Sequence, residues 1–343
     1  MIRKSTMEKE HFDYIDIAKG IGIFLVVIGH ALSALPTRTR EQTELIRTII
    51  YLVHMPLFFY IGGMLFQSRL GKYDQIGFYN FVKRKASQYL IPYIVFSIIL
   101  YILISILRLI PSFAWAVSKL GSAPRRTGDF LLSLFTYAHP VDDHLWFSYV
   151  MFIVLMISFL IRKADLRFLL IVFFAGYLST WIISFPEIIW KVLRYMLLFT
   201  AGRLSQKCGV QYSKKNLILS AILCAAGIGC YLPLKAGNIS LMACFKPLAE
   251  IGSSVFLLCL SNLIARANWS RHISKIGSYS YPIYLLHQPY IVPVILAIFS
   301  GDMIRNILGV VIAVVSGIII PIFLYTFVIR KNRVIKLLLT GRQ

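Results

Sequence analysis

Apolar runs long enough to cross a lipid bilayer follow one another along almost the whole chain. A helix of roughly 18 or more mostly apolar residues spans a hydrocarbon core of about 30 Å. The composition agrees, because 58% of the residues are hydrophobic and only 15% are charged, whereas a soluble domain is about half apolar and a quarter charged. The sequence therefore predicts an all-α membrane protein, with no sizeable soluble domain between its spans.

We predict a bundle of ten transmembrane helices, with boundaries good to a few residues. The predicted spans are 17–35, 48–66, 89–110, 144–161, 168–185, 188–202, 216–234, 247–265, 279–299 and 304–328. The sixth span is short and contains Lys191 and Arg194, so a bundle of nine helices is the alternative.

The distribution of Lys and Arg sets the orientation, because these residues are enriched in cytoplasmic loops. Ten spans place most of the 36 Lys and Arg residues in the cytoplasm, together with both termini. Nine spans would put the basic C-terminal segment outside. In the orientation with ten spans, the longest polar connection, 111–143, lies outside, where it could hold or cover a substrate.

The formal net charge of +22 follows mostly from this topology. Basic loops anchor a membrane protein against anionic lipid, so nucleic acid is not an expected partner.

The first apolar run could also be a signal peptide, because Arg3 and Lys4 precede it. Three features favour a span instead: the length of the run, Lys19 within it and the similar runs that follow. The 5 scattered cysteines indicate neither a disulfide framework nor a metal site.

Two ionisable residues lie within the first span. Lys19 and His30 are eleven residues apart, which leaves them some 20° from a shared helix face and about 16 Å apart along the axis. Asp16 stands three residues before Lys19 and can pair with it. Ionisable groups within spans usually face a bundle interior or a water-filled path and mark a reaction site. The alternative is that Lys19 reaches the interface while His30 packs between helices.

His54 and His287 lie within two further spans. His54 is in the second span at a depth comparable to that of His30, where it could line a polar pocket or serve helix packing. His287 lies between Pro282 and Pro289 in the ninth span, among hydroxyl side chains that can satisfy freed backbone groups. Three histidines in one bundle favour a polar interior.

Two connecting segments carry the other candidates. Lys83, Arg84 and Lys85 directly precede the third span, where they either anchor the loop or bind phosphate. Asp143 and Trp146 open the fourth span. They suit a helix cap and an aromatic belt, or equally an outer vestibule in which a sugar stacks on Trp146 and hydrogen-bonds to the carboxylate.

In this order, these segments resemble the acyltransferase 3 family of membrane O-acyltransferases, and most closely its fucose 4-O-acetylase-like branch. The resemblance covers about 13–328 as a single transmembrane domain. Its motifs are Asp16-Ile17-Ala18-Lys19-Gly20, Val26-Val27-Ile28-Gly29-His30, HMPLFFYIGG, KRKASQYLIPY, DDHLWF and Tyr284-Leu285-Leu286-His287. The esterase-like soluble domain that some members append is not found, so we expect the chain to act as a transferase alone or with a separate partner.

The resemblance implies transfer of an acyl group, usually acetyl from cytoplasmic acetyl-CoA, to a hydroxyl of a surface carbohydrate or its lipid-linked precursor. It implies a bacterial inner-membrane enzyme without a metal or a permanently bound cofactor. In the family an Arg stands eleven residues before the histidine, and here Lys19 keeps its charge but loses its bidentate geometry. His30 is then the general base, because an imidazole near neutrality can take a hydroxyl proton. The other implied contacts are Lys19, Lys83, Arg84 and Lys85 for the donor, and His54, Asp143, Trp146 and His287 for the acceptor.

Two other functions fit the same segments. Intramembrane His, Pro and Gly also suit a transporter or flippase of a sugar or lipid-linked precursor, although the two halves show no paired broken helices. A non-catalytic scaffold in a polysaccharide complex is the third interpretation. Consumption of acetyl-CoA would separate the enzyme from both.

Overall fold

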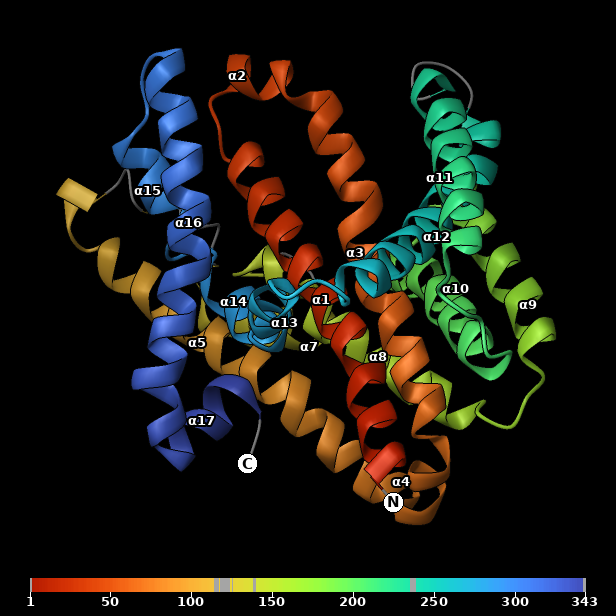
Figure 1. Cartoon of the computed structure of the whole chain (residues 1–343). Coiled ribbons are helices and arrows are strands. Elements are labelled where there is room, and N and C mark those ends of the chain that lie inside the picture. Colours follow the sequence, from red (N-terminus) through yellow and green to blue (C-terminus); the bar gives the residue numbers. More distant parts are fainter. Residues whose placement is uncertain are drawn as a thin grey trace. The chain divides into compact units, whose positions relative to one another are not determined.

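The computed structural model is built from helices joined by short connections (Figure 1). It describes residues 2–113, 117, 124, 126–137, 140–234 and 239–341. These residues contain no β-strand. The all-α membrane fold predicted from the sequence is therefore confirmed, whereas part of the expected outer connection at 111–143 lies outside the described residues.

The helices follow one another with few long connections. In chain order they are α1 (Ile2–Ser33), α2 (Thr37–Gln42), α3 (Glu44–Ser68), α4 (Leu70–Lys85), the π-helical turn η1 (Ala86–Leu90), α5 (Ile91–Leu107), α7 (Thr127–Thr136), the 3₁₀ turn η3 (Asp143–Leu145), α8 (Trp146–Leu160), α9 (Leu166–Ser179), α10 (Glu187–Lys207), α11 (Lys214–Leu234), α12 (Ile239–Ile264), α13 (Ser270–Ser278), α14 (Ser280–Leu286), α15 (Val292–Ile298), α16 (Met303–Phe327) and α17 (Arg333–Thr340). Short 3₁₀ turns also occur at Pro111–Phe113 and Ile329–Lys331.

Among the described residues, seven helical segments are long and apolar enough to cross a membrane. They are Asp13–Ser33, Glu44–Ser68, Leu70–Leu107, Asp143–Leu160, Lys214–Leu232, Ala243–Ile264 and Met303–Lys331. Each coincides with one of the ten predicted spans. The other three predictions fall on the shorter apolar helix α9, on the charged helix α10, and on the pair α14 and α15. The number of spans and the placement of both termini stay predictions.

The predicted ninth span is interrupted rather than continuous. α14 ends at Leu286 and α15 begins at Val292, and the residues between them are in turns. Pro289 and Pro293 cannot donate a backbone hydrogen bond, so an uninterrupted helix is disfavoured here. As a result His287 lies just beyond the end of a helix, where neighbouring carbonyl groups are available to its side chain.

The chain divides into two compact units. The first contains residues 1–26, 45–72 and 160–280, and the second contains residues 27–44, 73–159 and 281–343. Helices α9 to α13 and most of α3 belong to the first unit. Helices α5, α7 and α15 to α17 and nearly all of α8 belong to the second.

In the first unit, α3 and α10 are in backbone contact. A Cβ added at Gly63 would lie 1.9 Å from the carbonyl oxygen of Phe199. A Cβ added at Gly202 would lie 2.0 Å from the carbonyl oxygen of Tyr60. Small residues allow such close crossings in membrane bundles, where packing rather than hydrophobic burial drives helix association. The two glycines therefore set the spacing of these helices.

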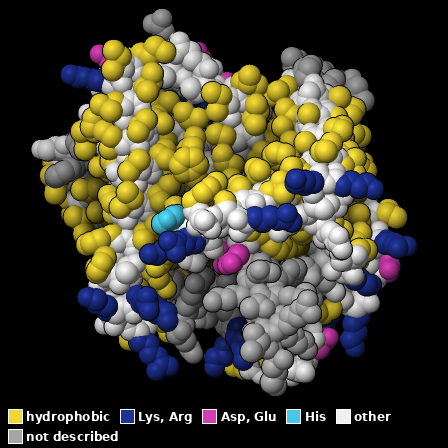
Figure 2. Space-filling view, in the orientation of Figure 1, with side chains coloured by type: hydrophobic (Ala, Val, Ile, Leu, Met, Phe, Trp, Pro, Cys, Tyr) yellow, Lys and Arg dark blue, Asp and Glu magenta, His cyan; other side chains and the backbone are white. Residues whose placement is uncertain are grey.

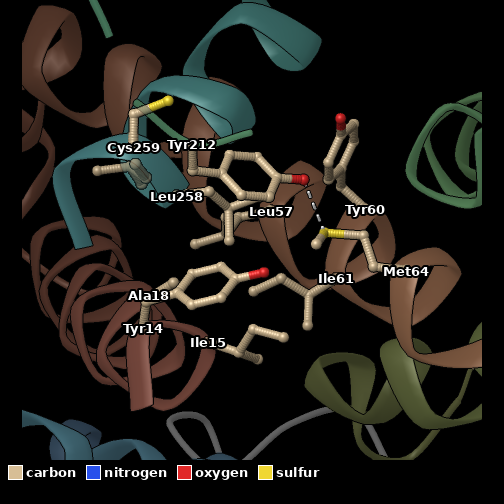
Figure 3. Packing of buried hydrophobic residues seen from close by; sticks show 11 residues of the cluster. Tyr14, Ile15, Ala18, Leu57, Tyr60, Ile61, Met64, Tyr212, Leu258 and Cys259 are labelled. Atoms are coloured by element: carbon tan, nitrogen blue, oxygen red, sulfur yellow. Dashed lines mark hydrogen bonds between the residues drawn. The ribbon is translucent and has the colours of Figure 1, made fainter. Parts of the chain in front are cut away.

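Beside this crossing lies a hydrophobic cluster, shown in Figure 3. Its buried members are Tyr14, Ile15, Ala18, Leu57, Tyr60, Ile61, Met64, Tyr212, Leu257, Leu258 and Cys259. The hydroxyl of Tyr212 donates to the Met64 sulfur at 3.2 Å, and the rings of Tyr14 and Tyr212 lie 5.5 Å apart. The cluster joins α1, α3 and α12 of the first unit to the connection before α11.

The charged residues of the predicted sixth span are paired within the first unit. Arg194 is buried and lies over the rings of Trp181 and Trp190, at 4.4 and 4.2 Å from their centroids. Its Nε donates to Thr180 Oγ1 at 2.9 Å, and Lys191 pairs with Glu187 one turn earlier. Cation–π contacts are strongest when desolvated, which explains how α10 accommodates a buried guanidinium.

In the second unit, α16 exposes a row of large apolar side chains. These include Ile304, Ile307, Leu308, Val311, Val315, Ile319 and Phe323. Hydrophobic side chains cover much of the face over this helix in Figure 2. An apolar row of this length is costly in water and suits contact with lipid.

Candidate active site

His287 lies where the predicted ninth span breaks. Its side chain is fully buried, at 0% exposure. Its Nδ1–H donates to the carbonyl oxygens of Ile283 and Tyr284, each at 2.9 Å. Because a carbonyl can only accept, Nδ1 carries a proton, and in the neutral ring Nε2 is then the nitrogen with the lone pair. This Nε2 is buried and has no hydrogen-bond partner within the described part of the chain.

Asp142 and His144 form a buried acid–imidazole contact before α8, which we call the Asp142–His144 pair. Oδ1 of Asp142 caps η3 by accepting a hydrogen bond from the His144 backbone N–H at 3.3 Å. The same oxygen also accepts from Nδ1 of the His144 ring. Among the described residues, neither His144 Nε2 nor Asp142 Oδ2 has a hydrogen-bond partner. The carboxylate thus orients the ring and leaves Nε2 for a ligand.

The rings of His30, His144 and His287 come together in the second unit, and we call them the histidine cluster. The centroids of His30 and His287 are 5.1 Å apart, and those of His144 and His287 are 5.6 Å apart. The three side chains come from α1, η3 and the end of α14. Buried polar atoms are normally hydrogen-bonded, so the two Nε2 atoms without partners mark a place where a polar ligand can bind and exchange a proton.

Tyrosine hydroxyls fix the backbone around the cluster. Tyr284 donates to the carbonyl oxygen of His144 at 2.9 Å, and Tyr137 donates to that of Asp143 at 3.0 Å. Burial raises the pKa of Tyr137 well above its usual value, so its hydroxyl stays a donor. The ring of Phe147 packs edge-on against Tyr284, with 5.4 Å between centroids.

Asp143 and Trp146, the predicted sugar contacts, lie next to the Asp142–His144 pair in the chain. Asp143 is exposed at the start of η3, and Trp146 is half-buried at the start of α8. The Trp146 ring lies edge-on to Phe147 at 6.4 Å. Both residues are placed beside the histidine cluster, and their contact with a sugar stays a prediction.

The basic segment Lys83, Arg84 and Lys85 ends α4 in the second unit. Lys83 and Arg84 are exposed. Lys85 lies over the rings of Tyr73 and Phe81, at 5.4 and 5.9 Å from their centroids. These contacts hold the Lys85 side chain against the protein. Lys83 and Arg84 are at the surface, where phosphoryl oxygens can reach them.

The π-helical turn η1 connects this basic segment to the elements that carry the cluster. Lys85 Nζ donates to Gln88 Oε1 at 3.4 Å. The hydroxyl of Tyr281 in α14 donates to the Gln88 carbonyl oxygen at 2.9 Å and lies 3.3 Å from Ser148 Oγ in α8. Single π-helical turns often occur at functional sites. Here the turn links the predicted donor cations to α14 and α8 through hydrogen bonds.

Two predicted site residues belong to the first unit. Lys19 Nζ pairs with Asp16 Oδ1 at 2.9 Å, and both side chains are half-buried, so the predicted pairing is present. His54 is buried, its Nδ1 donates to the Ile50 carbonyl oxygen at 2.6 Å, and its ring meets that of Tyr51 at 4.9 Å. The contacts described for His54 thus lie within its own helix. Its predicted contact with the acceptor stays a prediction.

Sequence reasoning missed Asp142 and His144 as site residues. It singled out the segment DDHLWF but assigned its functions to Asp143 and Trp146. The available signal was a carboxylate two residues before a histidine at the start of a span. An acid and a histidine at this spacing can meet only if the backbone turns tightly, and η3 supplies that turn.

Helices of membrane-spanning length, together with a buried cluster of imidazoles, define an integral membrane protein with an internal polar site. A family model described as an acyltransferase domain matches residues 12–326, and the chain belongs to the acyltransferase 3 family. It is therefore a membrane acyltransferase. Comparisons with curated proteins and with solved structures give no match.

Proposed function

We propose that this acyltransferase moves acetyl from cytoplasmic acetyl-CoA to a hydroxyl of a cell-surface carbohydrate or its lipid-linked precursor, in a bacterial inner membrane. The observation that carries the proposal is the histidine cluster, in which two buried Nε2 atoms have no partner among the described residues. A hydroxyl becomes an adequate nucleophile toward a thioester when a base removes its proton during attack. A neutral imidazole, which has a lone pair on one ring nitrogen, is such a base.

His30 is the proposed base for the acceptor hydroxyl. It lies in the last turn of α1, and its ring is 5.1 Å from that of His287. In this proposal His287, Trp146 and Asp143 are contacts for the acceptor. His54 belongs to the first unit, and its contact with the acceptor stays a prediction from the sequence. The reaction needs acetyl-CoA as a substrate and no permanently bound cofactor.

Lys83, Arg84 and Lys85 are the proposed contacts for the phosphates of the donor. Lys19 belongs to the first unit, and its contact with the donor stays a prediction from the sequence. Because Lys83 and Arg84 are exposed, we expect each to contribute about 0.2–1 kcal/mol. Changing both to Gln should therefore raise the KM for acetyl-CoA by about 2- to 30-fold, with kcat almost unchanged. Steady-state kinetics at two salt concentrations test this, since the difference should shrink at high salt.

Arg330 and Lys331 provide the matched control. They are also adjacent and exposed, and they lie in another predicted cytoplasmic segment. The Arg330→Gln, Lys331→Gln variant should keep the original KM. Equal changes in KM in the two double variants would show a general effect of surface charge rather than a donor site.

Release of CoA by the purified protein tests the proposed function. The protein is placed in lipid nanodiscs with acetyl-CoA and a panel of carbohydrate acceptors, while free thiol and acetylated product are measured together. We expect thiol and acetylated product in equal amounts. Solute flux in proteoliposomes without thiol release would instead support a transporter, and an inert protein that co-purifies with a polysaccharide complex would support a scaffold.

A further inference from the structure

The histidines of the cluster differ in what holds their rings. Nδ1 of His287 donates to two backbone carbonyl oxygens, whereas Nδ1 of His144 donates to the carboxylate of Asp142. Carbonyl groups fix a tautomer but bring no net charge. A carboxylate also favours the protonated imidazolium form of the ring that it contacts. Of these two rings, that of His144 is the one held by a charged group.

The charges in the cluster restrict how many imidazoles can be protonated together. Asp142 is buried, and its carboxylate contacts the ring of His144. His287 lies 5.6 Å from His144, so a second cation there would be repelled at short range in a poorly solvated site. Of the two rings, that of His144 has the carboxylate contact that a proton-donating imidazole needs. The neighbouring Tyr284 and Tyr137 are hydroxyl donors and add no charge.

We propose that the Asp142–His144 pair is the general acid of the reaction and protonates the sulfur of the departing CoA. This inference rests on the proposed function. A thiolate expelled inside a buried site would lose most of its solvation, and this cost makes a positioned proton donor valuable. His144 would be the catalytic residue. Asp142 would be a positioning residue, because it acts through the His144 ring.

The proton balance of the step is complete. The acceptor oxygen attacks the acetyl carbonyl carbon, and its proton goes to His30 as the new C–O bond forms. The C–S bond then breaks, the sulfur keeps the electron pair, and the His144 Nε2 proton passes to that sulfur. The site now holds one positive charge on His30 instead of His144. Return of that proton to His144 restores the starting state, and the ring of His287 is close to both, with centroids 5.1 Å from His30 and 5.6 Å from His144.

A change of leaving group tests the assignment. In the selenoester analogue of acetyl-CoA, selenium replaces the thioester sulfur, and the more acidic selenol leaves without needing a proton. With acetyl-CoA, His144→Gln should lower kcat by about 10²- to 10⁴-fold. With the selenoester, His144→Gln should regain most of the activity of the unaltered protein. His30→Ala should stay inactive with both donors, because the acceptor proton still has no base.

Asp142→Asn keeps the test independent of the His144 substitution. Asn is as good a helix cap as Asp, so the turn should persist while the charge is lost. The activity of Asp142→Asn with acetyl-CoA should fall, and its activity with the selenoester should recover. Asp142→Glu, which keeps the carboxylate, should restore part of the activity with acetyl-CoA. The exposed residues Asp129 and His272 supply controls. Asp129→Asn and His272→Gln should behave like the unaltered protein with both donors.

Two results would overturn the general-acid role. The first is equal impairment of His144→Gln and Asp142→Asn with both donors. That result would indicate that the pair acts on the proton of the acceptor hydroxyl instead of on the leaving sulfur. The second is full activity of both variants with acetyl-CoA. Membrane abundance and thermal midpoint are measured for each variant, and Asp142→Asn decides the outcome if His144→Gln does not fold. Absence of transfer by the unaltered protein would count against the proposed function itself.

Discussion

Replacement of His30 by Ala should lower acetyl transfer by about 10²- to 10⁴-fold, the usual contribution of a positioned general base. The reason is that the acceptor hydroxyl loses the imidazole that takes its proton during attack on the thioester. His30 is only half-buried, in the last turn of α1, so its truncation leaves the packing of the helix largely intact. The measurement is thiol release from acetyl-CoA in nanodiscs, at equal amounts of folded protein.

His272→Ala is the matched control for that substitution. His272 is an exposed histidine on α13, and its loss should leave both the rate and the membrane abundance unchanged. Normal acetyl transfer in His30→Ala would remove His30 from the mechanism. A comparable loss of rate in His272→Ala would indicate a general effect of histidine substitution.

The second large effect is expected on stability, at the crossing of α3 and α10. Gly63→Ala would bring a Cβ to 1.9 Å from the Phe199 carbonyl oxygen, and Gly202→Ala would bring one to 2.0 Å from the Tyr60 carbonyl oxygen. Overpacking typically costs about 1–3 kcal/mol. Here the obstacle is backbone rather than a side chain that can turn away. We expect the upper part of that range or a failure to fold.

Gly71→Ala is the control for the helix crossing. A Cβ at Gly71 meets nothing within 4 Å, so this variant should match the unaltered protein. Thermal unfolding in detergent and abundance in membranes would measure all three variants. Equal unfolding midpoints for Gly63→Ala and Gly71→Ala would contradict the backbone contact described between the two helices.

Much of the fold follows from local sequence properties. Runs of apolar residues predicted the seven long segments, because lipid requires a minimum helix length that a one-dimensional pattern reveals. The pairing of Asp16 with Lys19 was equally local, since residues three apart share a helix face. Prolines around His287 signalled a disturbed helix, although they did not show that the helix would end beside it.

The sequence did not predict which side chains meet in the candidate site. His30, His144 and His287 come from segments far apart in the chain, so their distances depend on tertiary packing. The contact of Asp142 with His144 depends on the tight turn η3. The hydrogen-bond partner of Arg203 could not be predicted for the same reason. Arg203 is buried, and its Nε donates to Gln67 Oε1 at 3.3 Å. Nothing near Arg203 in the sequence indicates that partner.

O-acetylation of a surface carbohydrate is tested directly by mass analysis of surface glycans from cells that contain the chain, lack it, or carry the His30→Ala variant at the same membrane abundance. We expect a glycan of the first cells to lack the mass of an acetyl substituent in the other two. Identical acetylation in all three would contradict the assignment of this membrane acyltransferase to O-acetylation of a surface carbohydrate.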